Sequence, residues 1–152
     1  MIDEISLSIL KILQEKARIP NVEVARQVGM APSAVLERIR KLEQQGYIDG
    51  YEVRLNPDRF GRPLVAFVHV AVEAQDCSGT VGKALTELAE AQEVHFISGE
   101  DGYLVKLRIA DHLALGELVR RQIAGIPGVR GTRTSISMAT MKETWRIPVD
   151  AP

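Results

Sequence analysis

The sequence predicts an α+β fold in two parts, because the spacing of its apolar residues changes once along the chain. Before residue 56, apolar residues recur every three or four positions, as in helices. After residue 63, runs rich in β-branched and aromatic residues alternate with helical segments. The stretch between them, NPDRFGRP, has two prolines and a glycine among charged residues, as linkers do. We therefore divide the chain into residues 1–55, a linker at 56–63 and a second domain at 64–147.

Three helices are predicted in the first 45 residues. Asp3 is a suitable N-cap for the first helix. Its apolar stripe contains Ile5, Ile9, Ile12 and Leu13. Pro20 breaks the chain before a second helix, and Gly29 supplies the turn after it.

The third helix carries the most informative pattern. Pro32 suits the first helical position and Gly46 suits a helix stop. Val35, Ile39 and Leu42 form one apolar stripe, which leaves a polar side opposite. Tyr47–Leu55, with its Asp49-Gly50 turn, is predicted to form a two-stranded hairpin. This order of elements is that of a winged helix-turn-helix, which places its second helix in the major groove of DNA.

The residues predicted to contact DNA follow from that geometry. Small or polar side chains early in the third helix can approach base edges, and cations further along suit phosphates. The candidates are Ser33, Ala34, Glu37, Arg38, Lys41 and Arg54. The net charge is only −1, and residues 1–60 hold nine Lys and Arg against nine Asp and Glu. A neutral module favours binding by dimers or larger assemblies. The alternative is a helical bundle whose polar face is merely solvated.

The second domain is predicted to have the element order βαββαβ. We expect strands at 64–72, 94–98, 103–109 and 129–138, and helices at 80–91 and 111–123, with Asp111 as a cap. This is the ferredoxin-like arrangement, in which helices cover one face of the sheet. The first strand is apolar on both faces. We therefore expect the face without helices to pack against a second sheet, which a second copy of this chain would provide.

Short motifs along the whole chain resemble those of the Lrp/AsnC, or feast/famine, family of transcription factors. They are Ser8-Ile9-Leu10, Val24-Ala25, Val28-Gly29, Pro32-Ser33, Val35–Ile39, Leu42-Glu43, Gly46–Ile48, Gly50-Tyr51, Leu55–Pro57, Ser98-Gly99, Tyr103-Leu104, Ile126–Val129 and Thr132–Thr134. The resemblance covers roughly residues 2–147.

The resemblance implies a DNA-reading domain followed by an amino-acid-sensing domain, in dimers and commonly in higher even oligomers such as octamers. It places the effector between dimers, at the turn that joins the second and third strands. On this chain the implied effector residues are Gly99, Glu100, Asp101, Gly102 and Tyr103, faced by Thr134, Ser135 and Ile136 of the last strand.

The chain departs from the family pattern at two places. Ala31 stands where the family usually has a serine before the proline of the third helix, so a side-chain N-cap is lost. The effector turn usually reads Gly-x-x-Asp-aromatic, but here the acidic Asp101 comes one position early and Gly102 takes its place. An ordinary amino-acid ligand, an altered ligand and no ligand all remain open.

Other classes of function find little support in the sequence. We expect no catalytic residues, no metal and no cofactor, because His69, His95 and His112 lack metal spacing and no phosphate loop or nucleophile grouping is present. The absence of a long apolar run and of a signal peptide predicts a cytoplasmic protein with no membrane partner. Two alternatives to a regulator are kept: an enzyme like the sirohaem decarboxylases, which resemble this fold pair, and an architectural protein that compacts DNA.

Overall fold

The computed structural model describes residues 2–73, 79–99 and 102–149. They divide into two units. One comprises Met1–Arg54 together with Lys142–Pro152, and the other comprises Leu55–Met141. The chain passes from the first unit to the second between Arg54 and Leu55, and residues 142–147, which we placed with the second domain, group with the first unit. In the described part, no helix is both long enough and apolar enough to cross a membrane.

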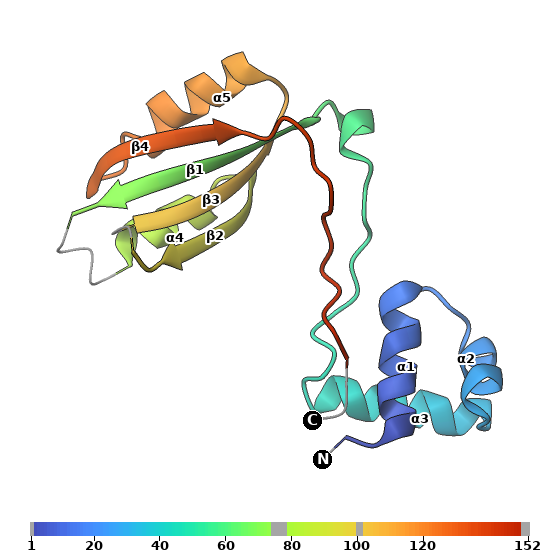
Figure 1. The fold of residues 1–152 in the computed structure, drawn as a ribbon. Coiled ribbons are helices and arrows are strands. Elements are labelled where there is room, and N and C mark those ends of the chain that lie inside the picture. The colour runs from blue at the N-terminus through green and yellow to red at the C-terminus, as the bar shows by residue number, and fades with distance from the viewer. Residues whose placement is uncertain (1, 74–78, 100–101, 150–152) are drawn as a thin grey trace. The chain divides into compact units, whose positions relative to one another are not determined.

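Three helices form the first unit: α1 (Glu4–Glu15), α2 (Asn21–Val28) and α3 (Pro32–Gln44) (Figure 1). Their core consists of Ile9, Val24, Ala25, Val35, Ile39 and Leu42. Asp3 caps α1 as predicted, because its side chain accepts from the backbone N–H of Ser6. Ile5 was expected in the stripe but is 38% exposed, since Ser6 and Leu7 take the buried positions of that turn.

Both ends of α3 agree with the sequence prediction. Pro32 occupies its first turn, and Ala31 before it makes no side-chain cap. Gly46 follows the helix with a φ of 73°, a conformation that glycine adopts without strain. The N–H of Tyr47 then donates to the carbonyl of Leu42 at 2.9 Å, which satisfies one of the last carbonyls of the helix.

The predicted hairpin at Tyr47–Leu55 is wrong: residues 45–56 contain no strand. Gly50 does not adopt the positive φ that a tight Asp-Gly hairpin turn requires. Instead, the hydroxyl of Tyr51 donates to Oε1 of Glu43 on α3 at 2.9 Å. A two-stranded hairpin without a surface to pack on is marginal in water, which agrees with the absence of a strand in this segment.

The chain's tail is held to α1 within the first unit. The backbone N–H and carbonyl of Ile147 pair with the side-chain amide of Gln14, at 2.9 and 3.0 Å. Arg146 donates to the carbonyl of Glu15 at 3.3 Å.

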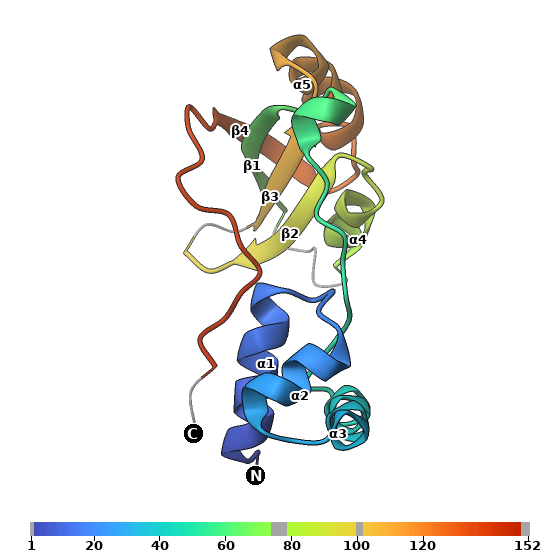
Figure 2. The ribbon, with the colours of Figure 1, turned by 90° about the vertical axis from the view of Figure 1, so that its right-hand side faces the viewer.

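The second unit contains one antiparallel sheet in the order β2-β3-β1-β4. Its elements are η1 (Pro57–Phe60), β1 (Leu64–Val72), α4 (Thr80–Thr86), β2 (Ala91–Ile97), β3 (Gly102–Ile109), α5 (His112–Leu118), a π-helical turn at Val119–Ile123 and β4 (Val129–Ile136). Both α4 and α5 lie on the same side of the sheet (Figures 1 and 2). The predicted ferredoxin-like fold is confirmed.

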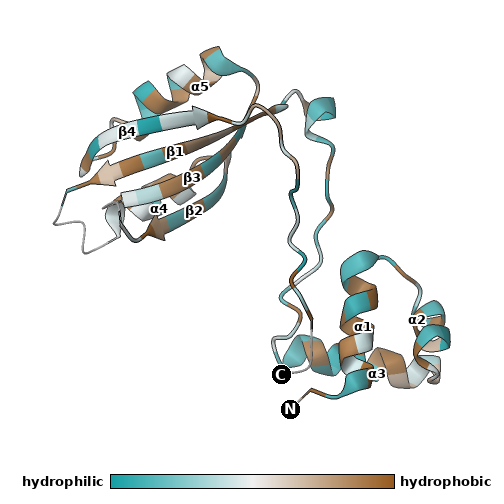
Figure 3. Ribbon diagram, viewed as in Figure 1, coloured by the Kyte–Doolittle hydropathy of each residue, from teal (hydrophilic) through white to brown (hydrophobic). Residues whose placement is uncertain are grey.

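The core of this unit lies between the sheet and its two helices. It combines alternate residues of β1 and β3 with Val81 and Leu85 of α4, and with Leu115, Leu118 and Ile123 from the region of α5. Asp111 caps α5 as predicted, accepting from the N–H of Ala114 at 2.8 Å. Most of β1 is apolar along its length, whereas β4, at the edge of the sheet, is mainly polar (Figure 3).

Candidate nucleic-acid interface and effector region

The polar side of α3 forms a continuous exposed row. Ser33, Glu37 and Lys41 are spaced four residues apart and are all exposed, so they follow one another along the helix. Ala34 is half-buried beside them, and the buried stripe is on the other side of the helix. We call Ser33, Glu37 and Lys41 the reading row. Small and polar groups come first and a cation follows, which is the order that an approach to base edges and then phosphate requires.

Arg38 points toward α1 rather than along the reading row. Its guanidinium donates to the carboxylate of Asp3 at 2.6 Å and to the hydroxyl of Ser6 at 3.0 Å. The sequence prediction treated Asp3 only as a helix cap and missed this contact. The available signal was that both oxygens of a capping carboxylate can accept hydrogen bonds.

The other predicted phosphate contacts differ in their surroundings. Arg54 is exposed and lies 3.9 Å from the partly buried Glu143 of the tail, which makes a long and weak pair. Within residues 2–73, 79–99 and 102–149, Lys41 and its neighbour Arg40 form no ion pair.

The predicted effector turn is only partly described, since Glu100 and Asp101 lie outside the described residues. Gly99 is exposed and has a φ of 90°. Gly102 begins β3 and is buried. Tyr103 is also buried, at 8% exposure, with its ring edge-on to Phe96 at a centroid distance of 5.2 Å. The Tyr103 ring therefore packs in the core of the second unit.

The structure does not bring Thr134, Ser135 and Ile136 to the turn within one chain. Strand β1 lies between β3 and β4, and Tyr103 is in line with Val70 and Thr132 across the sheet. Ser135 is instead in line with Phe67 and Lys106, further along the strands. The expectation that these residues face the turn between dimers stays a prediction. The sequence reveals strand order but not this register.

The sheet face away from α4 and α5 is mixed in character. We call it the open face, and it carries Phe67 and His69 of β1, Leu104 and Lys106 of β3, and Glu93 and His95 of β2. Phe67 is 38% exposed.

An ion pair crosses the open face between β3 and β2. Lys106 donates to Glu93 at 2.9 Å, and this hydrogen bond lowers the pKa of the Glu93 carboxyl below its ordinary value. Sequence analysis missed this pair, which joins opposite charges on neighbouring strands.

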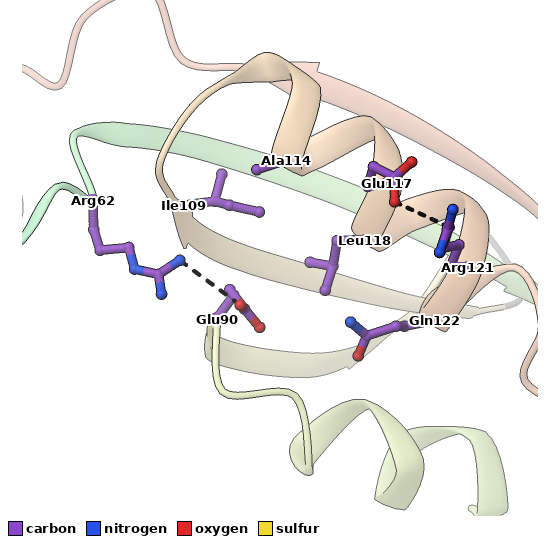
Figure 4. Close-up of a pocket in the computed structure, with 8 residues that line it drawn as sticks. All are labelled: Arg62, Glu90, Ile109, Ala114, Glu117, Leu118, Arg121 and Gln122. Atoms are coloured by element: carbon purple, nitrogen blue, oxygen red, sulfur yellow. Dashed lines mark ion pairs between the residues drawn. The ribbon is translucent and has the colours of Figure 1, made fainter.

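A surface hollow of about 220 Å³ lies beside α5 in the second unit (Figure 4). Ile109, Ala114 and Leu118 contribute apolar side chains to it, and Gln122 lies at its edge. Each end carries an ion pair, Arg62 with Glu90 at 3.8 Å and Arg121 with Glu117 at 3.0 Å. Of the predicted effector residues that the structure describes, none lines the hollow. Among the described residues, no group of three or more His, Cys, Asp or Glu could hold a metal ion.

Similarity to known proteins decides the family. Residues 65–147 match the family model of the Lrp/AsnC ligand binding domain, and residues 2–49 match that of a winged helix-turn-helix DNA-binding domain. The chain belongs to the Lrp/AsnC family. This Lrp/AsnC chain is a transcriptional regulator that joins a DNA-binding domain to a ligand-binding domain, as predicted.

Individual relatives agree with this family assignment. The leucine-responsive regulatory protein of Escherichia coli K12 is 38% identical over 150 residues, which cover 97% of this chain and 92% of that protein. A transcriptional regulator from Neisseria meningitidis, crystallised with L-methionine, superposes with a TM-score of 0.93 at 27% identity, covering 99% and 98% of the two chains. A feast or famine regulatory protein from M. tuberculosis, also with L-methionine, gives 0.89 at 29% identity, with 99% and 100% covered. These relatives are named as regulators, and nothing in the similarities favours the sirohaem decarboxylase alternative.

Proposed function

We propose that this regulator reads DNA through the reading row of α3, with Ser33, Ala34 and Glu37 at base edges and Lys41 at a phosphate. The observation that carries this proposal is the exposed row on the third helix of a helix-turn-helix unit. The carboxylate of Glu37 can accept from the N4 amino group of cytosine, which would give a preference at one base pair. Arg54 is a further phosphate contact, because its side chain is exposed and its pair with Glu143 is long, at 3.9 Å.

We propose homodimers, and higher even oligomers built from them, as the DNA-binding form. A nearly neutral DNA-binding unit gains affinity when two copies bind one two-fold site. The open face supports dimerisation, since it leaves Phe67 exposed on a central strand. The proposed regulator is not an enzyme, and we place it in the cytoplasm because it acts on DNA.

The proposed effector is an amino acid or a related small molecule. Support comes from the two similar regulators crystallised with L-methionine. Because Thr134, Ser135 and Ile136 lie away from the turn within one chain, a site that uses both groups takes them from different copies. The Gly99–Tyr103 turn, including Glu100 and Asp101, would then supply backbone N–H groups for the carboxylate and an acidic group for the ammonium. Effector binding would change which oligomer is populated and hence the spacing of the reading helices.

A DNA-binding titration tests the reading row. Sequences bound by the full chain are first selected from random DNA, and affinity is then measured for the selected and a random duplex. Lys41→Ala should weaken binding to both duplexes, whereas Glu37→Ala should relax the preference at one base pair, worth about 1–3 kcal/mol. Lys11→Ala, an exposed cation of α1, is the matched control and should change neither.

The same titration separates the remaining alternatives. Equal affinity for selected and random duplexes would identify an architectural DNA-binding protein. Repeating it with each amino acid tests the effector proposal, because an effector must change the affinity or the stoichiometry of the complex. If no amino acid alters either quantity, the sensing role is refuted while DNA reading stands.

A further inference from the structure

A polar link joins the first turn of α1 to the middle of α3. Nη1 of Arg38 donates to Oδ2 of Asp3 at 2.6 Å and to Oγ of Ser6 at 3.0 Å. The other carboxylate oxygen, Oδ1 of Asp3, accepts from the backbone N–H of Ser6 at 2.7 Å. One carboxylate thus caps α1 and holds a side chain of α3 at the same time.

Arg38 lies at the edge of the buried stripe and not in the reading row. It follows the buried Val35 by three residues and precedes the buried Leu42 by four, so its Cβ leaves the helix on their side. Its side chain is 31% exposed, whereas Ser33, Glu37 and Lys41 all lie on the exposed side. The direction of Arg38 is therefore set by its place on the helix and by the acceptors on α1.

The link adds directional contacts to helices that otherwise meet through apolar packing. The cluster of Ile9, Val35 and Ile39 is held by the hydrophobic effect, which is not directional. A charge-assisted hydrogen bond weakens when its distance or angle changes, so it resists rotation and sliding of α3 against α1. Ser6 is buried at 7% exposure, and its hydroxyl accepts from Arg38, which ties the link to the packed interior.

Asp3 stays ionised under ordinary conditions. The hydrogen bond from Arg38, followed by those from Ser6, lowers the pKa of the Asp3 carboxyl to about 2. At neutral pH the link therefore keeps both of its charges.

We propose that Asp3 and Arg38 are positioning residues for DNA recognition: their link fixes α3 relative to α1 so that the reading row meets the base edges. This proposal rests on the proposed DNA-reading function and replaces the predicted base contact of Arg38. Asp3, on another helix, becomes a determinant of specificity without touching a base.

The decisive variant is Asp3→Asn in the full chain. Asparagine caps helices about as well as aspartate, so α1 keeps its cap while the charged bond to Arg38 is lost. With Arg38 as a positioning residue, Asp3→Asn should lower affinity for the selected duplex by about tenfold. Affinity for random DNA should not fall. If Arg38 instead contacts DNA, the variant frees a cation and removes a negative charge, so affinity should rise or stay the same.

Arg38→Gln and the double variant complete the test. Arg38→Gln should cause a loss similar to that of Asp3→Asn, and combining them should cause little further loss, because both remove the same link. The salt dependence of binding to the selected duplex is the second readout. A removed phosphate contact lowers its slope by about one, as we expect for Lys41→Gln, whereas Arg38→Gln should leave the slope unchanged.

Two results would overturn the positioning role: undiminished selected-site affinity in Asp3→Asn, or a slope lowered by about one in Arg38→Gln. Failure of the DNA-reading function looks different, since no duplex would then be preferred and Lys41→Gln would change nothing. Thermal unfolding and the oligomer mass are measured for each variant. A variant that unfolds cooperatively and keeps its mass has a shifted helix and not an unfolded unit.

Discussion

Tyr51 joins the segment that follows α3 to the helix itself. Its hydroxyl donates to Oε1 of Glu43 at 2.9 Å. Partial burial, together with the hydrogen bond to the carboxylate, favours the neutral phenol and raises the pKa of Tyr51 from 10.0 to about 12. Because the pKa in the folded state is raised, the contribution to stability is fully present below pH 10 and is lost as the pH rises through 12.

Alkaline titration checks this contact. The absorbance of tyrosinate measures the titration of the three tyrosines in the chain. One of them should titrate near pH 12 in the wild type, and that transition should be missing in Tyr51→Phe. Glu43→Gln should lower the pKa of Tyr51 only in part, because burial is the larger cause. If Tyr51 titrates at the ordinary pKa of tyrosine in the wild type, its contact with Glu43 does not persist in solution.

At the scale of elements, sequence patterns foresaw every strand and helix that packs against a core. The apolar stripe of α3, the two-sided apolar pattern of β1 and the caps at Asp3 and Asp111 are local signals, and the structure confirms them. The hairpin failed because its stability depends on what it packs against. Helix α4 ends at Thr86 rather than Ala91, since Ala91 already pairs with Leu107 in the sheet.

The candidate sites were foreseen less completely for the same reason. The exposure of Ser33, Glu37 and Lys41 follows from helical spacing and could be predicted. The partner of Arg38 lies 35 residues away, and the register that separates Ser135 from Tyr103 depends on three paired strands. Neither has a local signature.

Gly102 shows how closely β3 and β1 approach each other. A Cβ at this position would lie 2.1 Å from the carbonyl oxygen of Val70, so the backbone of β1 would have to move. Glycine is therefore required here by packing.

Gly102→Ala should therefore destabilise the second unit by about 2 kcal/mol, since overpacking against a backbone cannot be relieved by a rotamer change. Urea unfolding followed by circular dichroism measures the effect. Gly131→Ala is the matched control in β4, because nothing lies within 4 Å of a Cβ at that position. Equal stability of the two variants would mean that β1 and β3 separate easily at this end.

At the scale of the whole molecule, the chain connects its two units twice. It leaves the first unit at Arg54, forms the sheet, and returns at Lys142 to bind α1 through Gln14 and Ile147. The family's ligand-binding domain is matched up to residue 147, so its last residues are physically part of the DNA-binding unit. The second unit is thus connected to the first by the chain that follows α3 and by a tail that is hydrogen-bonded to α1.

The assembly itself depends on the open face in our proposal. Phe67→Asp places a carboxylate on β1 at the centre of the open face, opposite Lys106 on β3, and removing that charge from water against a second sheet is costly. Sedimentation velocity should show a smaller species than the wild type. Leu113→Asp alters an exposed apolar residue of α5 on the other side of the sheet, and it should leave the mass unchanged.

The smaller species formed by Phe67→Asp should also bind the selected duplex more weakly than the wild type, because one copy reads only half of a two-fold site. A variant of unchanged mass would rule out this face as the contact between copies, whereas a smaller species with full affinity would mean that one copy is enough to read the DNA.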